Sequence, residues 1–213
     1  AVTRQEQDQY AYGSYLKTYK AIKNKYFKNE LCQTNLKDEV RTDTTLVKLS
    51  QLKPVFKKKG SVSAGNASSL NDGAAFLALA SSEYIKANRI KPLAKVLSWS
   101  SSAGNPNYMG ITPITAIQKL MKKMSVNISF FDLIEINEAF AATSVAVQRS
   151  LKIDPNKLNI VGGAIALGHP IGCSGTRIVT TLAHQLKRTK KKFGVASMCI
   201  GGGQGLAMAI EKL

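Results

Sequence analysis

The sequence after residue 92 alternates between short apolar runs and longer stretches in which apolar residues recur every three or four positions. The first pattern is typical of strands and the second of helices. Strands are predicted at 93–100, 132–137, 158–163, 193–200 and 205–213, and helices at 113–124, 138–151 and 174–188. This succession favours an α/β layer structure whose sheet is at least partly parallel.

Three of the predicted strands end at unusual residues. Asn137 follows the first, the glycine-rich stretch 162–173 follows the second, and 199–205 follows the third. Ligand groups in such sheets lie in the loops that leave the carboxyl ends of strands. His169 occupies a Gly-His-Pro turn between a strand pattern and a helix pattern, which favours a chemical role over that of a satisfied core histidine. The other histidine, His184, lies mid-helix and is predicted to be structural.

The N-terminal part of the chain is less regular. Residues 3–6 form a capping box, and a helix is predicted after it whose apolar stripe packs on the core. This stripe consists of Tyr12, Tyr15, Tyr19, Ile22 and Tyr26. Because lysines flank the tyrosines, a stacking surface for single-stranded nucleic acid is the alternative interpretation. Residues 30–60 look irregular apart from a short helix at 46–52. An Ala-rich helix of about 17 residues is then predicted to end before Pro92.

The charge is strongly basic, with 30 Lys and Arg against 13 Asp and Glu and a net charge of +17. Such an excess attracts nucleic acid, anionic membranes or phosphate-bearing cofactors, and a solvated basic surface is the favoured interpretation. Three cysteines cannot all pair, which favours a reducing compartment. No apolar run approaches the ~20 residues of a membrane span. We expect a cytoplasmic protein without a metal site, with mitochondria and peroxisomes left open.

Four motifs and one loop, in order along the chain, resemble those of the thiolase family. NEAFAA (137–142), GGAIALGHPIG (162–172) and CIGGGQG (199–205) resemble its three C-terminal signatures. Upstream, the segment that starts at Arg41 resembles the family's coenzyme-A-binding segment, and MGITP resembles a loop that starts at Met109. The resemblance covers essentially the whole chain. CIGGG, in place of CIGTG, favours the acetyl-CoA C-acetyltransferase (acetoacetyl-CoA thiolase) type.

This resemblance implies a layered α/β/α/β/α fold built from two similar halves, in an enzyme that assembles as dimers or tetramers. Residues 1–70 would complete the loop domain, 71–93 would be a helix completing the N-terminal half, and 94–213 would form the C-terminal half. The family's nucleophilic cysteine belongs to the N-terminal half, and Cys32, in a polar irregular stretch, does not replace it. We therefore expect the chain alone to be inactive and the missing half to be its partner.

The residue chemistry agrees with such an activity. Joining two acetyl thioesters requires a base that removes a methyl proton beside donors that stabilise the enolate oxygen. Cys199 is the candidate base, and it needs positive potential or hydrogen bonds to lower its pKa. By resemblance, the Gly201 N–H is an oxyanion donor, and Asn137 holds a water there unless it only caps a helix beginning at Glu138. His169 would activate the nucleophile and contact the thioester oxygen.

Coenzyme A is expected as a substrate rather than a permanent cofactor. The resemblance places Ser68 against the pantetheine with Phe56 and Phe140 beside it, Arg41 near the adenine, and Met109 in a nearby loop. Cys173, at the start of a helix, is a rival to Cys199 on electrostatic grounds. The alternatives are a non-catalytic CoA- or acyl-binding module, a 3-ketoacyl-CoA thiolase of broader chain length, and a nucleic-acid binder.

Overall fold

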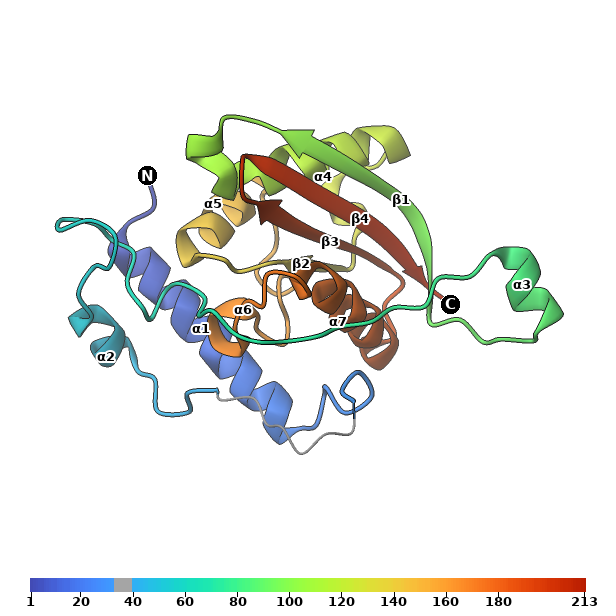
Figure 1. Ribbon diagram of the computed structural model, residues 1–213, viewed down its shortest axis with the longest axis horizontal. Coiled ribbons are helices and arrows are strands. Elements are labelled where there is room, and N and C mark those ends of the chain that lie inside the picture. The colour runs from blue at the N-terminus through green and yellow to red at the C-terminus, as the bar shows by residue number, and fades with distance from the viewer. Residues whose placement is uncertain (33–39) are drawn as a thin grey trace.

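The computed structural model describes residues 1–32 and 40–213 (Figure 1). Part of the stretch predicted to be irregular, residues 33–39, lies outside them. The helices are α1 Arg4–Lys23, α2 Leu46–Gln51, α3 Ser82–Ala87, α4 Thr112–Met124, α5 Ala141–Leu151, α6 Ala164–Leu167 and α7 Ser174–Thr189, with 3₁₀ turns η1 Pro106–Ile111 and η2 Ile128–Phe130. The strands are β1 Ala94–Ala103, β2 Leu133–Ile136, β3 Phe193–Ile200 and β4 Gln204–Lys212.

The four strands form one sheet in the order β1-β4-β3-β2. β2 runs parallel to β3, whereas β4 is antiparallel to both β3 and β1. The predicted α/β class with a partly parallel sheet is therefore confirmed. β2 and β3 end at the same edge of the sheet, because parallel strands share a direction, and both Asn137 and Cys199 lie there.

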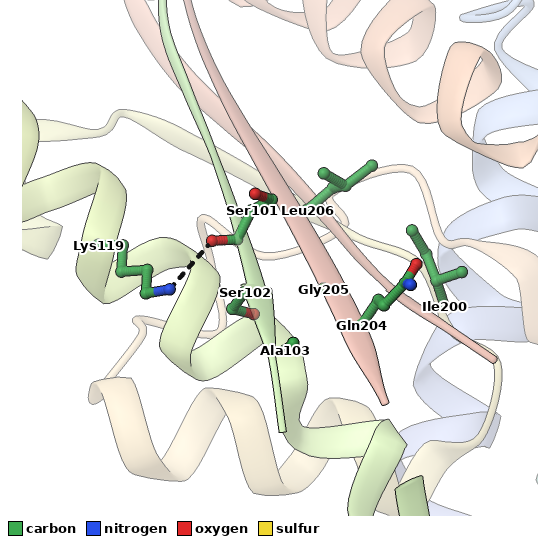
Figure 2. Close-up of a pocket in the computed structure, with 8 residues that line it drawn as sticks. All are labelled: Ser101, Ser102, Ala103, Lys119, Ile200, Gln204, Gly205 and Leu206. Carbon is green, nitrogen blue, oxygen red and sulfur yellow. Dashed lines mark hydrogen bonds between the residues drawn. The ribbon is translucent and has the colours of Figure 1, made fainter. Parts of the chain in front are cut away.

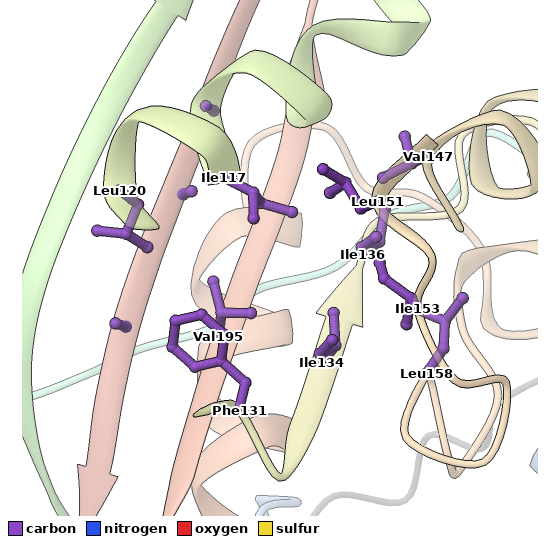
Figure 3. Packing of buried hydrophobic residues seen from close by; sticks show 13 residues of the cluster. Ile117, Leu120, Phe131, Ile134, Ile136, Val147, Leu151, Ile153, Leu158 and Val195 are labelled. Carbon is purple, nitrogen blue, oxygen red and sulfur yellow. The ribbon is translucent and has the colours of Figure 1, made fainter. Parts of the chain in front are cut away.

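Helices cover both faces of the sheet. α4 and α5 pack on the face that carries Ile134, Val195 and Ala209, and Figure 3 shows the fully buried ring of Phe131 among these side chains. α7 packs on the other face through Ile178, Leu182 and Leu186. Since an amphipathic helix gains most of its stability from burying its apolar stripe, α4 and α7 form where the sequence pattern predicts.

The prediction of a strand at 158–163 is wrong. Only isolated bridges form there, Ile134 to Leu158 and Ile160 to Gly162. Asn159 adopts a φ of 44°, and its side chain replaces the backbone of a strand. Its Oδ1 accepts from Ile136 N at 2.8 Å and its Nδ2 donates to Ile136 O at 2.9 Å. An amide side chain offers the same donor and acceptor as a peptide group, so β2 keeps a partner without a fifth strand.

Helix α1 begins with the predicted capping box at Thr3 and Glu6. The prediction for its buried face is confirmed at Tyr15, which is 6% exposed and belongs to the core, and is wrong at Tyr19 and Ile22, which are 45% and 41% exposed. The buried residues are mainly small or polar: Gln7, Asp8, Ala11, Ser14, Tyr15, Thr18 and Ala21. Several have hydrogen-bond partners, as in the bond from Asn66 Nδ2 to Asp8 Oδ1 at 2.8 Å. Buried polar side chains with partners replace apolar packing along this helix.

The Ala-rich helix is also much shorter than predicted. Only Ser82–Ala87 is helical, and residues 70–81 run in an irregular path past α6 and α7 (Figure 1). Leu70, Phe76 and Leu79 are more than 80% exposed. A helix of this size needs another element against its apolar face, and the described part of the chain provides none. We call residues 70–81 the exposed segment.

Part of the α7 face of the sheet is uncovered. Register places Trp99 opposite Met208 and Ser101 opposite Leu206. An open cavity of about 480 Å³ lies over β1, β4 and the end of β3, and Figure 2 shows Ser101, Gln204 and Leu206 at it. Trp99 is 58% exposed and Leu206 43% exposed, so large apolar side chains face solvent on this side.

Candidate active site

Asn137 and His169 meet at the carboxyl end of the sheet. Asn137 is fully buried, and its N–H continues the parallel pairing by donating to Ser197 O at 3.0 Å. The Asn137 side-chain Nδ2 lies 3.2 Å from His169 Nε2. The His169 backbone N–H donates to Ser69 O at 3.0 Å, which fixes the turn from a third segment. The structure thus brings together two of the four predicted catalytic residues.

The hydrogen bonds around His169 favour one tautomer. Its Nε2 lies 3.2 Å from the Asn137 amide nitrogen, which only donates, so Nε2 is assigned as the unprotonated nitrogen. Nδ1 then carries the proton and donates to Ser174 Oγ, 2.6 Å away, while Ser174 Oγ donates to Pro170 O at 3.0 Å. Burial lowers the pKa of His169, and the positive charge of Arg177 lowers it further, so the ring is neutral at pH 7.

Cys199 lies on β3, beside the strand that ends at Asn137. Its side chain is buried, and no hydrogen bond joins its thiol to another described residue. Burial raises its pKa, although a backbone hydrogen bond offsets part of the increase. The expectation that its surroundings would lower the pKa is wrong for the described residues. A raised pKa keeps Cys199 as a thiol at pH 7.

A glycine turn follows Cys199. Gly202 and Gly203 have φ values of 86° and 91°, a region that favours glycine. Gly201 is exposed, and a Cβ there would meet nothing within 4 Å. Gly203 O accepts from Gly104 N at 2.8 Å, which holds the turn against the end of β1. The backbone N–H of Gly201 is therefore carried on an open turn next to the buried thiol.

Three of the residues predicted to contact coenzyme A gather beside Asn137. Ser68 donates to Ala139 O from both its backbone N, at 3.0 Å, and its Oγ, at 3.1 Å. The rings of Phe56 and Phe140 meet edge to face with centroids 6.1 Å apart, and Phe56 is 74% exposed. Phe56 thus lies against Phe140, and Ser68 against Ala139, both within three residues of Asn137 in the chain.

The other predicted CoA contacts lie elsewhere. Met109 belongs to η1, which packs on the start of α5, since a Cβ on Gly110 would lie 2.6 Å from Thr143 Oγ1. Arg41 is exposed, and its positive charge acts on Tyr15 of α1.

Asn137 is not a helix cap. Helix α5 begins at Ala141 with Phe140 in the N-cap position, three residues later than the predicted start at Glu138. Cys173 is buried at the N-cap of α7, and a Cβ on Gly73 would lie 3.3 Å from its sulfur. His184 lies on α7, as predicted for a structural residue.

Sequence reasoning missed Ser174 and Glu138. Ser174 starts α7 five residues after His169, and that spacing around the turn could have indicated its contact with the ring. Glu138 is 1% exposed and accepts four hydrogen bonds. Glu138 directly follows Asn137 in the chain, but no sequence pattern indicates that α1 supplies hydrogen-bond donors to Glu138.

Comparison with known proteins identifies first the class of protein and then the family. A Staphylococcus aureus protein (strain NCTC 8325) named "Probable acetyl-CoA acyltransferase" is 44% identical over 99% of this chain and 56% of its own length. The Bacillus anthracis acetyl-CoA acetyltransferase structure superimposes with a TM-score of 0.95 and 45% identity, over 100% of this chain and 57% of its own. The structure of human mitochondrial 3-ketoacyl-CoA thiolase in complex with CoA superimposes with a TM-score of 0.94 and 43% identity, over 100% of this chain and 55% of its own.

Two family models together match nearly the whole chain. The N-terminal domain of thiolase matches residues 1–83, and the thiolase C-terminal domain matches residues 90–212. The chain belongs to the thiolase family and has the thiolase fold, which confirms the resemblance. It spans slightly more than half the length of these relatives. None of the described helices is long and apolar enough to cross a membrane.

Proposed function

We propose that this chain is the CoA-binding and C-terminal part of an acetyl-CoA C-acetyltransferase, which condenses two acetyl-CoA to acetoacetyl-CoA and CoA and catalyses the reverse thiolysis. The contact between Asn137 and His169, at the edge of the sheet where β3 brings Cys199, supports this proposal most directly. The division into residues 1–70, 71–93 and 94–213 remains part of the proposal.

The first half-reaction uses His169. A cysteine thiol from the remaining length of the enzyme transfers its proton to His169 and attacks the thioester carbonyl of acetyl-CoA. The C–S bond to CoA breaks, the proton returns to the departing CoA sulfur, and an acetyl-enzyme forms. The lowered pKa suits His169 to this work, since the ring must be neutral to accept a proton.

Cys199 then serves the carbon–carbon step. In its thiolate form, which its raised pKa makes the minor form at pH 7, Cys199 removes a methyl proton from a second acetyl-CoA, and the enolate carbon attacks the acetyl-enzyme carbonyl. The new C–C bond forms as the enzyme thioester breaks and releases the first cysteine. In thiolysis, the Cys199 thiol instead returns a proton to the enolate carbon, and its raised pKa supplies the protonated form. The Gly201 N–H and the Asn137 side chain with its water are the proposed donors to the oxyanions.

Coenzyme A is the carrier of the substrate acyl group in this proposal. The exposed ring of Phe56, with Phe140 behind it, would cover the pantetheine, and Ser68 would lie beside it. Arg41 is proposed to contact the adenine end, because an exposed guanidinium can stack on a base and bind phosphate.

The N-terminal half of the enzyme is the proposed partner of the exposed segment and the uncovered sheet face. Both present large apolar side chains, Phe76 and Leu79 on the segment and Trp99 on the sheet. A chain of relatives' length would have enough residues to cover them. The complete enzyme is proposed to be a homodimer or homotetramer without nucleic-acid or membrane partners, and its cytoplasmic location stays a prediction.

The proposal is tested by comparing two cysteines in the complete enzyme. Cys199→Ser should lower turnover in acetoacetyl-CoA thiolysis at least ~100-fold, near the low end of a general acid–base contribution. Cys173→Ala should stay within a few-fold, since its side chain packs beside Gly73. The chain of 213 residues alone should show no thiolysis. Loss of activity in Cys173→Ala with a normal Cys199→Ser would overturn the assignment.

Acyl-chain preference is tested with a series of 3-ketoacyl-CoA substrates of increasing length. The CIGGG sequence motivates the short-chain assignment. We expect kcat/KM to be highest for acetoacetyl-CoA and to decrease as carbons are added. A maximum at longer chains would favour the broader 3-ketoacyl-CoA type.

A further inference from the structure

Glu138 is a buried carboxylate whose hydrogen bonds come from three different parts of the chain. Oε1 accepts from Tyr10 OH at 3.1 Å and from Asn159 Nδ2 at 2.9 Å. Oε2 accepts from Ser14 Oγ at 2.6 Å and from Ile165 N at 3.2 Å. The donors therefore belong to α1, to the residue that pairs with the end of β2, and to the start of α6.

The direction of each bond can be assigned. Ser14 Oγ accepts from Gly163 N at 3.1 Å, so its own proton is free for Glu138. Asn159 Nδ2, 3.2 Å from Tyr10 OH, can only donate and shares its two hydrogens among Ile136 O, Glu138 Oε1 and Tyr10 OH, so it does not take the Tyr10 proton, which is likewise free for Glu138. Every partner of Glu138 is then a donor, and four donors on two oxygens fit an ionised carboxylate, which only accepts. A protonated acid or an amide would place hydrogen against hydrogen on one side.

These bonds join the two loops that carry Asn137 and His169. Glu138 directly follows Asn137, and Ile165 is the second residue of the short helix α6, which leads into the Gly168–His169 turn. The packing is tight, because a Cβ on Gly163 would lie 2.7 Å from Glu138 Oε2. We propose that Glu138 is a positioning residue, whose ionised carboxylate sets the distance and orientation of Asn137 relative to His169. Its importance for catalysis rests on the proposed function.

Glu135 provides a matched control. It lies three residues earlier on β2 and is 2% exposed, but no described residue donates a hydrogen bond to it. Burial raises its pKa to about 8. Glu135 is mostly protonated at pH 7, so glutamine is a close substitute at that position. At position 138, the glutamine amide nitrogen would place its hydrogens against two of the groups that now donate to the carboxylate.

Two measurements test the role of Glu138. The first, on residues 1–213, is ¹⁵N NMR of the imidazole rings across pH, with His184 as the internal reference. Glu138→Gln should shift the pKa of His169 or populate its other tautomer, and Glu135→Gln should do neither. The second, in the complete enzyme, is the rate of acetoacetyl-CoA thiolysis. Glu138→Gln should lower kcat about 10- to 100-fold, with KM within about twofold, as expected for misplaced reacting groups.

Tyr10→Phe keeps the charge and removes one donor, so it should give a smaller change of the same kind in a folded protein. This variant decides the case where Glu138→Gln does not fold. An unaltered His169 titration in folded Glu138→Gln or in Tyr10→Phe would overturn the positioning role. If the complete wild-type enzyme lacks thiolysis while His169 responds as expected, only the proposed function fails.

Discussion

In one region of the molecule polar side chains are buried, and in another apolar side chains are exposed, the reverse of the usual pattern. Beneath the candidate site, α1 buries Ser14 and Thr18 against the loops of Glu138 and Val161, and hydrogen bonds satisfy these polar groups. In the exposed segment, Phe76 and Leu79 face solvent. The difference shows that partners decide burial: a polar side chain with a matched donor or acceptor is retained, and an apolar one without a packing surface is not.

The largest expected effect concerns Glu135 and Glu30, two carboxylates whose pKa is raised by burial. Burial raises the pKa of Glu135 from 4.5 to about 8, and that of Glu30 to about 7, where Thr181 and Arg177 offset only part of the increase. Between pH 4.5 and 8 the folded state retains protons that the unfolded state releases. The free energy of unfolding should therefore decrease by several kcal/mol as pH rises through this range.

Chemical denaturation at pH 5, 6.5 and 8 measures this dependence. Glu135→Gln should flatten the profile by removing one of the two groups. A wild-type stability that instead increased steadily over this range would show that both carboxylates are ionised in the folded protein.

Gly162 tests how tightly α1 packs on the loops. It has a φ of 79°, and a Cβ would overlap Thr18 Oγ1 and the Ser14 carbonyl. Gly162→Ala should lower the free energy of unfolding by about 2–5 kcal/mol, because the left-handed backbone is strained with a Cβ and the added methyl group is overpacked. Gly172→Ala is the control, since a Cβ there meets nothing within 4 Å, and thermal unfolding of both variants should separate them.

Ser14 tests the polar partners without a change of backbone. Ser14→Ala leaves the Gly163 N–H without its acceptor and Glu138 with one donor fewer. We expect a loss of about 1–3 kcal/mol in urea unfolding. Ser50→Ala removes an exposed hydroxyl that bonds only to Val47 O and should be neutral. Equal stability of the two variants would mean that the buried hydrogen bonds contribute nothing.

The smallest effect is expected in the exposed segment. Phe76→Ser combined with Leu79→Ser should change the stability of residues 1–213 by less than about 0.5 kcal/mol, because neither side chain packs on a core. In the complete enzyme the same double substitution should lower the free energy of unfolding by several kcal/mol if the N-terminal half covers these two side chains. A large loss in the short chain would show that the segment packs there in solution.

The sequence predicts elements well where their pattern is decided locally. β3, α4 and α7 follow from apolar periodicity, and the capping box at Thr3 identifies the start of α1. The errors arise where distant residues decide. Asn159 substitutes for a strand through its side chain, which periodicity cannot express. The Ala-rich helix before Pro92 was predicted from composition, which contains no information about what would cover its N-terminal part, and only Ser82–Ala87 is helical.

The candidate site was predictable to the same extent. Motif order indicated Asn137 and His169, and the structure places their side chains in contact. Ser174 and Glu138 act through tertiary contacts, and the partners of Glu138 lie as far away as Tyr10. The raised pKa of Cys199 could not be read from local sequence.

Trp99 is the single tryptophan of the chain, and it lies on the uncovered face of the sheet at 58% exposure. Its indole is therefore a built-in optical reporter of that surface alone. In residues 1–213 its fluorescence should be red-shifted and quenched readily by iodide or acrylamide. Titration with a separately produced N-terminal half should shift the emission to the blue and protect it from quencher, so that joining of the two halves can be followed in real time without a label.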